Sequence, residues 1–238
     1  MILNDKIAVI TGASSGIGEE FSRILVEKGV TVYGLARRKE RLDALQQELG
    51  STFITVKADI TDKDEIARFV TSTFNADHSP DILINNAGLG GFSPVDEMPV
   101  EDWDHMVGVN LSGLFYITRL IVPFMKEDPD VTHIINIASV AGLVSNPDLS
   151  AYNATKHGVR GFSNALMKEL RMFGIKVTCL YPGSIATGFF EKTGRDVHSN
   201  MLKGSDVASV LVHVLETPDN FLIDELVMRP LIPKPPVK

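Results

Sequence analysis

Short apolar runs rich in β-branched residues alternate with longer amphipathic stretches along this chain. The runs do not alternate strictly between apolar and polar positions, so they predict strands that are covered on both faces. Amphipathic stretches at residues 19–28 and 41–49, which end at Gly29 and Gly50, predict helices with glycine C-caps. The predicted strands are residues 6–11, 31–35, 52–56, 81–85, 133–138, 176–181 and 224–228.

The alternation of strand and helix predicts an α/β fold. We expect a doubly wound parallel sheet of about seven strands with helices on both faces. No low-complexity linker or internal repeat divides the chain, so a single domain over residues 1–238 is expected. Ligands of such sheets bind at the carboxyl ends of the strands, near the point where the winding reverses.

Composition narrows the class of partner. The formal net charge is -7 and no block of Lys or Arg stands out, which argues against nucleic acid and anionic membranes. No apolar run approaches the ~20 residues that span a bilayer. The single cysteine, Cys179, cannot form an intramolecular disulfide, and the N-terminus lacks the features of a signal peptide, so a cytoplasmic protein is expected. Residues 229–238 are proline-rich and predict an extended tail.

A glycine-rich loop follows the first predicted strand directly. It reads T-G-A-S-S-G-I-G over residues 11–18 and places Gly12, Gly16 and Gly18 before a predicted helix. Glycine permits a tight turn and close approach of the backbone to a ligand. The N-terminus of the following helix offers free N–H groups and a positive dipole end to a phosphate. The loop therefore predicts a dinucleotide site.

The end of the second predicted strand indicates which dinucleotide is bound. A fold that prefers NAD usually places an acid there for the ribose 2′-hydroxyl, but this chain has Arg37 and Arg38. Guanidinium pairs well with phosphate, and cations at a helix N-terminus otherwise oppose the helix dipole. We therefore expect NADP as the cofactor, with Ser14 adding a hydroxyl contact to the same phosphate.

Tyr152 and Lys156 lie four residues apart in a predicted helix, and Ser139 lies upstream. Residues at i and i+4 share a helix face, so the ammonium can lower the pKa of the phenol and make it an active proton donor. A tyrosine and a lysine at this spacing are also common on ordinary helix surfaces. The pair alone therefore does not decide between catalysis and chance.

Taken together, the motifs resemble the single-domain branch of the short-chain dehydrogenase/reductase family, over roughly residues 5–230. The resemblance implies a Rossmann-type fold and, more weakly, a relationship to members that act on hydroxy acids and alcohols with NADP. The motifs that carry it are T-G-A-S-S-G-I-G (11–18), A-D-I (58–60), N-N-A-G (85–88), V-N-L (109–111), I-N-I-A-S (135–139), Y-N-A-T-K (152–156) and Y-P-G (181–183).

The resemblance implies a role for each matching residue. Tyr152 would exchange a proton with the substrate oxygen, Ser139 would orient that oxygen, and Lys156 would lower the phenol pKa and hold the nicotinamide ribose. Asn110 would hold a water in a proton path through Lys156. The implied cofactor-binding residues are Gly12, Ser14, Ser15, Gly16, Ile17, Gly18, Arg37, Arg38, Asp59, Ile60, Asn86, Ala87, Gly88, Tyr152, Lys156, Pro182, Gly183, Ile185 and Thr187.

The substrate pocket is less clearly defined by the sequence. Residues 188–204 would form a lid, in which Arg195 could meet a carboxylate substrate. No metal is expected, since the six histidines show no ligand spacing. The implied lining residues are Leu89, Gly90, Phe92, Ala141, Leu143, Asn146, Leu149, Phe189 and Phe190.

Three alternatives to this interpretation differ in chemistry. A sugar-nucleotide epimerase would need a different glycine loop and a larger C-terminal region. A non-catalytic NADPH-binding regulator could share the fold, although it would not need all four catalytic residues. The same chemistry with NAD is also open, and the sequence does not identify the carbonyl or alcohol substrate, the stereochemistry or the physiological direction.

Two helices also predict self-association. The helix that carries Tyr152 and the preceding stretch at residues 113–125 have more apolar and small residues than one buried face requires. The resemblance implies that these helices pair across a subunit interface. A homotetramer or homodimer is therefore expected.

Overall fold

The fold is built around one seven-stranded sheet, described here from a computed structural model over residues 1–186 and 197–233. Every strand pair is parallel, and the order is β3-β2-β1-β4-β5-β6-β7. The predicted doubly wound sheet is confirmed, and each predicted strand lies within one or two residues of an observed one. The strands are β1 Ile7–Thr11, β2 Thr31–Ala36, β3 Phe53–Lys57, β4 Ile82–Asn85, β5 Thr132–Ile137, β6 Ile175–Pro182 and β7 Glu225–Met228.

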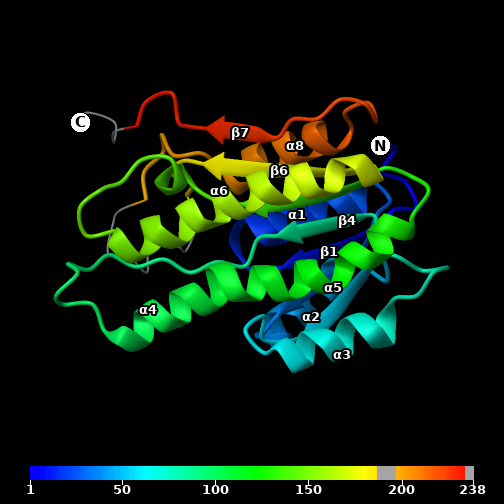
Figure 1. Cartoon of the computed structure of the whole chain (residues 1–238), viewed down its shortest axis with the longest axis horizontal. Helices are drawn as coiled ribbons and strands as arrows, with labels where there is room; N and C mark the ends of the chain where they lie inside the picture. Colours follow the sequence, from blue (N-terminus) through cyan, green and yellow to red (C-terminus); the bar gives the residue numbers. More distant parts are fainter. Residues whose placement is uncertain (187–196, 234–238) are drawn as a thin grey trace.

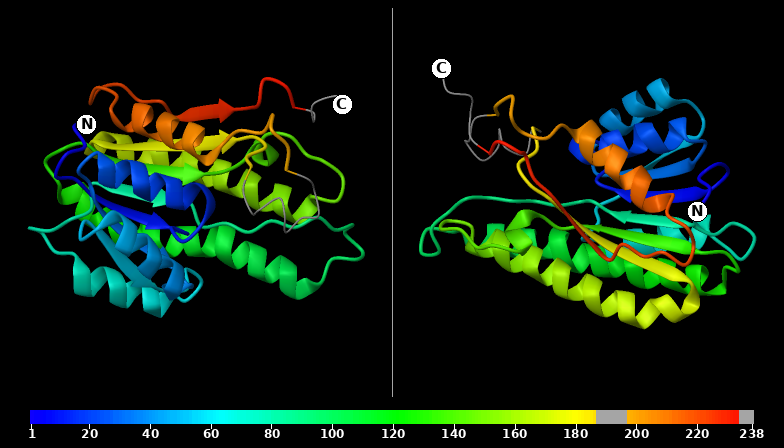
Figure 2. Two further views of the ribbon diagram at one scale, coloured as in Figure 1. Left: turned by 180° about the vertical axis from the view of Figure 1, so that it is seen from behind. Right: turned by 90° about the horizontal axis from the view of Figure 1, so that it is seen from above.

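Helices cover both faces of the sheet (Figures 1 and 2). On one face, α1 (Gly16–Glu27), α2 (Lys39–Leu49) and α8 (Gly204–Leu215) enclose a first apolar core. On the other face, α3 (Lys63–Thr73), α5 (Leu114–Glu127) and α6 (Ser150–Leu170) enclose a second one. The strands between the two cores are buried on both sides, which explains their continuous apolar runs.

A continuous helical stretch runs from Val100 to Glu127 beside α6. It consists of α4 (Val100–Val107), a π-helical segment η1 (Gly108–Gly113) and α5. Its length and composition would allow it to cross a membrane, although core helices of soluble proteins pass the same test. Ile117, Ile121 and Met125 of α5 are fully buried in the second core, so one face of this stretch packs inside the molecule.

The glycine loop between β1 and α1 has the backbone that its sequence predicts. Gly12 and Gly16 have positive φ angles of 70° and 61°, a region that side chains disfavour. A Cβ on Gly12 would lie 2.9 Å from the Cα of Ala87, so the loop packs directly on the chain after β4. This contact brings together the carboxyl ends of β1 and β4, where the strand order reverses.

Candidate functional site

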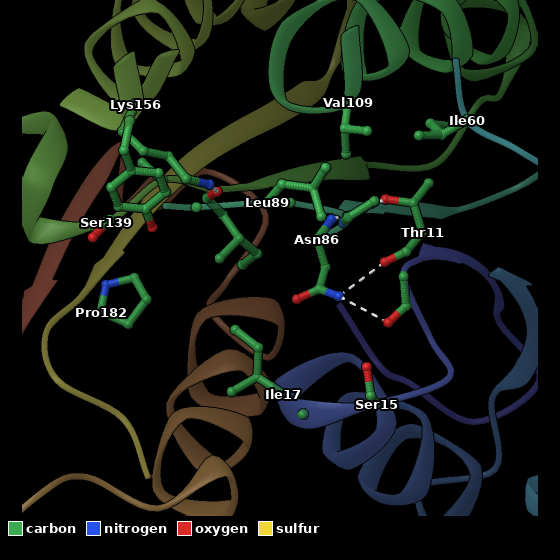
Figure 3. A pocket seen from close by; sticks show the side chains of 18 of the residues that line it. Thr11, Ser15, Ile17, Ile60, Asn86, Leu89, Val109, Ser139, Lys156 and Pro182 are labelled. Carbon is green, nitrogen blue, oxygen red and sulfur yellow. Dashed lines mark hydrogen bonds between the residues drawn. The ribbon is translucent and has the colours of Figure 1, made fainter. Parts of the chain in front are cut away.

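A cavity of about 700 Å³ opens at the carboxyl edge of the sheet. Figure 3 shows Ser139, Lys156 and Pro182 at one end of it and Thr11 and Ser15 toward the other. The sequence-predicted residues that line the cavity are Gly12, Ser14, Ser15, Gly16, Ile17, Arg37, Arg38, Asp59, Ile60, Asn86, Ala87, Gly88, Ser139, Tyr152, Lys156, Pro182, Gly183 and Ile185.

Asn86 fixes the glycine loop against the end of β4. Its side-chain Nδ2 donates to the carbonyl oxygens of Thr11 (2.9 Å) and Gly12 (3.3 Å), as the dashed lines in Figure 3 mark. The Thr11 hydroxyl oxygen in turn accepts from the backbone N–H groups of Asn86 and Ala87, both at 3.0 Å. Thr11 also lines the cavity, and the sequence reasoning did not select it as a site residue.

Three arginines line one end of the cavity. Arg38 Nη2 donates to the hydroxyl oxygens of Ser14 (3.1 Å) and Ser15 (2.7 Å), which ties this guanidinium to the glycine loop. Burial first, and then the nearby charges of Arg41 and Arg37, lower the pKa of Arg38. Arg41 was missed by the sequence reasoning, although its place in R-R-K-E-R puts it one helical turn beyond the predicted pair.

Asp59 forms the wall beside the arginines. Its Oδ1 accepts from the backbone N–H of Thr61 (2.9 Å) and from the Thr61 hydroxyl (2.7 Å), and its Oδ2 lies 3.7 Å from Arg37 Nη1. Burial alone would raise the pKa of Asp59, but these contacts outweigh it and hold the pKa below its ordinary value. The carboxylate therefore partly neutralises one of the three cations.

The proposed catalytic groups meet at the opposite end. Tyr152 and Lys156 project from the first turns of α6, and Ser139 caps the short 3-10 helix η2 (Val140–Gly142) after β5. Lys156 Nζ donates to the carbonyl oxygen of Ile137 at 2.9 Å and lies 5.8 Å from the centre of the Tyr152 ring. Neighbouring strand and helix thus place an ammonium, a phenol and a hydroxyl around one cavity end.

The pKa of Tyr152 differs in direction from the sequence-based expectation. Burial raises it to about 12, and a hydrogen bond with Ser139 acts in the opposite direction without cancelling the effect. Burial also lowers the pKa of Lys156 to about 8. The pKa of the phenol is therefore not lowered overall, because desolvation outweighs the effect that favours the phenolate. Tyr152 is therefore a protonated phenol at neutral pH.

Asn110 lies in the π-helical segment η1 and does not line the cavity. Its Oδ1 accepts from the N–H of Leu89 (2.8 Å), and its Nδ2 donates to the Leu89 carbonyl (2.9 Å) and to Thr155 Oγ1 (2.9 Å). The side chain therefore joins α6 to the loop that forms the cavity wall after β4. The water-holding role remains a prediction.

A few other predicted residues lie elsewhere. Gly18 does not line the cavity; a Cβ there would lie 2.5 Å from the Gly12 carbonyl oxygen, so Gly18 serves close packing of α1 on the loop. Leu143 packs on a small apolar cluster with Tyr181 instead of lining the substrate end. The predicted residues Thr187, Phe189, Phe190 and Arg195 fall outside the described residues.

The substrate end is mostly apolar over the described residues. Of the predicted lining residues, Leu89, Gly90, Phe92, Ala141, Asn146 and Leu149 are found there, and Gly91, Val140 and Ser184 join them. The described residues contain no cluster of three His, Cys, Asp or Glu side chains that could hold a metal ion. The hydrogen-bonding groups in this part of the cavity include the hydroxyls of Ser139 and Tyr152 and the amide of Asn146.

Comparison with known proteins agrees with this geometry. The family model for short chain dehydrogenases matches residues 6–198. An uncharacterized oxidoreductase of Staphylococcus saprophyticus is 34% identical over 96% of this chain and 97% of its own. Similar solved structures include a closed serine dehydrogenase complexed with NADP+ (33% identity, 94% and 95% of the two chains, TM-score 0.88). Another is a 3-ketoacyl-(acyl-carrier-protein) reductase from Brucella melitensis complexed with NADH (30%, 94% and 97%, TM-score 0.86).

Three observations point to the same family. They are the match to the family model, the order of the strands in the sheet, and the position of Ser139, Tyr152 and Lys156 around one cavity. The cavity also joins the glycine loop to the carboxyl ends of the strands, where dinucleotides bind in this type of sheet. The chain therefore belongs to the short-chain dehydrogenase/reductase family and is an oxidoreductase that depends on a nicotinamide cofactor.

Proposed function

We propose that this protein transfers hydride between NADP(H) and a small carbonyl or alcohol substrate, with Tyr152 as the proton donor and acceptor. One observation carries the proposal. A single cavity holds three arginines at one end and Ser139, Tyr152 and Lys156 at the other. This separation suits a dinucleotide whose phosphorylated ribose and reactive ring lie far apart.

Each of the proposed catalytic residues has a separate role in the reaction. When bound, the cofactor supplies or accepts the hydride. Negative charge that develops on a carbonyl oxygen during reduction is stabilised by the hydroxyls of Ser139 and Tyr152, and Tyr152 then gives its proton to that oxygen. Lys156, held by the Ile137 carbonyl, places a positive charge beside the phenol and is available to the ribose hydroxyls. A protonated Tyr152 at neutral pH suits the direction of reduction.

The proposed preference for NADP rests on Arg37, Arg38 and Arg41. A well-formed charge-assisted hydrogen bond to phosphate contributes about 1.5–3 kcal/mol, so one or two such bonds, reduced by solvent exposure, favour NADPH about 10- to 1000-fold. The similar solved structures include complexes with NADP and with NADH or NAD, so the family alone does not determine the choice. The arginines therefore carry this part of the proposal.

The proposed substrate is a ketone, 3-oxo acid or hydroxy acid whose reacting carbon carries an apolar group. Leu89, Phe92, Val140 and Leu149 would face that group, and Asn146 is the neutral amide beside them. Of the predicted lid at residues 188–204, residues 188–196 lie outside the described residues. Within this segment, the backbone N–H of Leu202 donates to the carbonyl of Ser184, so its described end is fixed to the cavity wall.

The proposal is tested by turnover of NADPH and of NADH with a panel of ketones, 3-oxo acids and diketones, and of NADP+ and NAD+ with a panel of hydroxy acids. Consumption of NADPH with at least one carbonyl substrate is expected. Tyr152→Phe should abolish turnover on that substrate and leave the dissociation constant for NADPH nearly unchanged, because the ring remains and only the hydroxyl group is lost. Substantial activity in this variant would contradict the role of Tyr152.

The same experiment distinguishes the alternatives. Tight binding of NADPH without turnover of any panel member would favour a non-catalytic regulator. A ratio of kcat/KM for NADPH over NADH below one would favour an NAD-linked dehydrogenase and would mean that the arginines are an ordinary solvated helix start. In both cases the fold would be unchanged, and only the interpretation of one end of the cavity would be wrong.

We also propose that the protein forms a homotetramer or homodimer in the cytoplasm. Phe115 of α5 is 47% exposed, and α6 presents the small residues Ala154, Gly161 and Ala165 on its exposed side. An exposed apolar ring beside a shallow helix surface is typical of a helix–helix interface. Cys179, the single cysteine of the chain, is buried.

A further inference from the structure

We propose that Asn153, which follows the catalytic tyrosine, is a positioning residue that fixes Ser139 relative to Tyr152. The inference rests on the proposed function, since it concerns the same catalytic groups. Asn153 lies in the first turns of α6 and is 5% exposed, and its side chain does not line the cavity. It therefore cannot act on the substrate directly and must act through other residues.

The Asn153 amide holds the chain segment that begins at Ser139. Its Nδ2 donates to the carbonyl oxygens of Ala141 (2.6 Å) and Val144 (2.9 Å), and its Oδ1 accepts from the N–H of Asn146 (3.4 Å). Both donor hydrogens of the amide are thus used on one segment. Because the amide is buried, these bonds are costly to break.

A single residue, Ala141, connects this amide to the Ser139 hydroxyl. The carbonyl of Ala141 accepts from Asn153, and the N–H of Ala141 donates to Ser139 Oγ at 3.2 Å. A hydroxyl that accepts from the backbone keeps its own hydrogen for donation. The Ala141 bond therefore directs the hydroxyl hydrogen of Ser139 away from η2. In that direction, a substrate oxygen or the hydroxyl oxygen of Tyr152 can accept it.

Close backbone packing supports the same arrangement. A Cβ on Gly142 would lie 2.6 Å from the carbonyl oxygen of Lys156, so η2 rests directly on the α6 backbone. This contact limits the distance between the two elements but does not fix the rotation of the segment. The three hydrogen bonds of Asn153 supply that constraint, and they also set the position of Asn146 in the cavity wall.

Two substitutions separate the donor function from side-chain shape. Asn153→Ala removes the whole amide, whereas Asn153→Asp keeps its shape and its acceptor but cannot donate to the two carbonyls. Both variants should lower kcat about tenfold or more, because a small displacement of a catalytic group has effects of this size. The dissociation constant for NADPH should change less than about twofold, because the arginine end of the cavity lies on other elements.

Asn164→Ala provides a matched control on the same helix. Asn164 donates to Glu225 at 3.2 Å and lies outside the cavity, so its loss should leave kcat unchanged. The Asn153→Ala and Ser139→Ala substitutions are then combined in a double variant, and its activity is compared with that of each single variant. If Asn153 acts through Ser139, the double variant should be no less active than Ser139→Ala alone. Fully additive losses would overturn the proposal.

The pH profile and hydrogen exchange give two independent readouts. Because the bond with Ser139 lowers the pKa of Tyr152, Asn153→Ala should move the midpoint of alcohol oxidation to higher pH. Amide exchange of residues 140–146 should accelerate in Asn153→Ala and not in Asn164→Ala. Unchanged exchange would overturn the proposal even if the wild-type protein turns over no substrate, whereas an inactive wild type with accelerated exchange would refute only the proposed function.

Discussion

Lys156 shows how burial lowers the pKa of a group that we propose to be catalytic. Its side chain is 5% exposed and donates to the Ile137 carbonyl, which compensates only part of the lost hydration. Its pKa falls from 10.5 to about 8, while that of Tyr152 rises to about 12. At neutral pH the pair is an ammonium beside a neutral phenol, which agrees with the proposed role of Tyr152 as a proton donor.

The lowered pKa of Lys156 predicts a pH-dependent stability. Between about pH 8 and 10.5 the unfolded chain keeps a proton on this lysine that the folded chain has released. The free energy of unfolding should therefore rise with pH in this window, by about 2 kcal/mol between pH 8 and 10, relative to Lys156→Met. Urea unfolding of both proteins at several pH values measures the difference. Parallel curves would show that the folded lysine keeps its ordinary pKa.

Arg41 provides a second prediction at the scale of single residues. It lines the cavity with Arg37 and Arg38, and its charge contributes to the lowered pKa of Arg38. Arg41→Ala should lower kcat/KM for NADPH about 3- to 30-fold through KM and leave that for NADH nearly unchanged. Arg68→Ala, an exposed arginine on α3, is the control. Equal effects on both cofactors would exclude a contact with the 2′-phosphate.

The spacing of the motifs identified Ser139, Tyr152 and Lys156, because the periodicity of a strand or helix determines which of its side chains face the cavity. The sequence did not reveal Arg41 or the direction of the tyrosine pKa shift. Arg41 reaches the cavity through the angle at which α2 leaves β2, and the pKa depends on how much protein surrounds the phenol. Neither quantity follows from the order of residues alone.

At the scale of elements, a buried polar network links the central strands to α5 and α6. Asn85 on β4 donates to Thr118 Oγ1 (2.9 Å) and to Asn136 Oδ1 (2.8 Å), and Asn136 on β5 donates to Ser163 Oγ (2.9 Å). All four side chains are at most 3% exposed. The network positions α6, and with it Tyr152, relative to the sheet.

Loss of this network should destabilise the protein. Asn136→Ala leaves the Asn85 amide and the Ser163 hydroxyl with fewer partners in the interior. The free energy of unfolding should fall by about 1–3 kcal/mol. Urea unfolding should show a lower midpoint with an unchanged slope. Gln47→Ala, at an exposed position of α2, is the control and should change the stability by less than about 0.5 kcal/mol. An equal effect of both substitutions would contradict the structural importance of the network.

The strands were easier to predict than the segments between helices. Buried parallel strands produce continuous apolar runs, whereas the π-helical η1 has no distinctive periodicity in G-V-N-L-S-G. The wider turn of η1 places Asn110 against Leu89 and Thr155. The V-N-L motif indicated that Asn110 matches the family, but it did not indicate these contacts. Likewise, the sequence wrongly placed Leu143 in the cavity lining and did not indicate Ser184, because loop conformations do not follow periodicity.

At the scale of the molecule, the two faces of the sheet contribute different parts of the site. The face with α1 and α2 supplies the glycine loop and the arginines, and the face with α6 supplies Tyr152 and Lys156. The reversal of strand order between β1 and β4 brings both sets to one edge of the sheet. The alternation of strands and helices predicted a site at the carboxyl ends of the strands near this reversal, but it did not indicate which face supplies which residues.

Self-association is the prediction that belongs to the whole molecule. The wild-type protein should be a dimer or tetramer of the 26.0 kDa chain, with α5 and α6 at the interface. Phe115→Glu places a charge on the exposed part of α5 and should shift the protein toward the monomer, because an unpaired charge is costly in an apolar contact. Val95→Glu, at a loop position that is 79% exposed, is the matched control and should leave the oligomer intact. Light scattering coupled to gel filtration at micromolar concentration measures the mass. A wild-type protein of only 26.0 kDa would contradict the prediction, and an unchanged oligomer in Phe115→Glu would place the interface elsewhere.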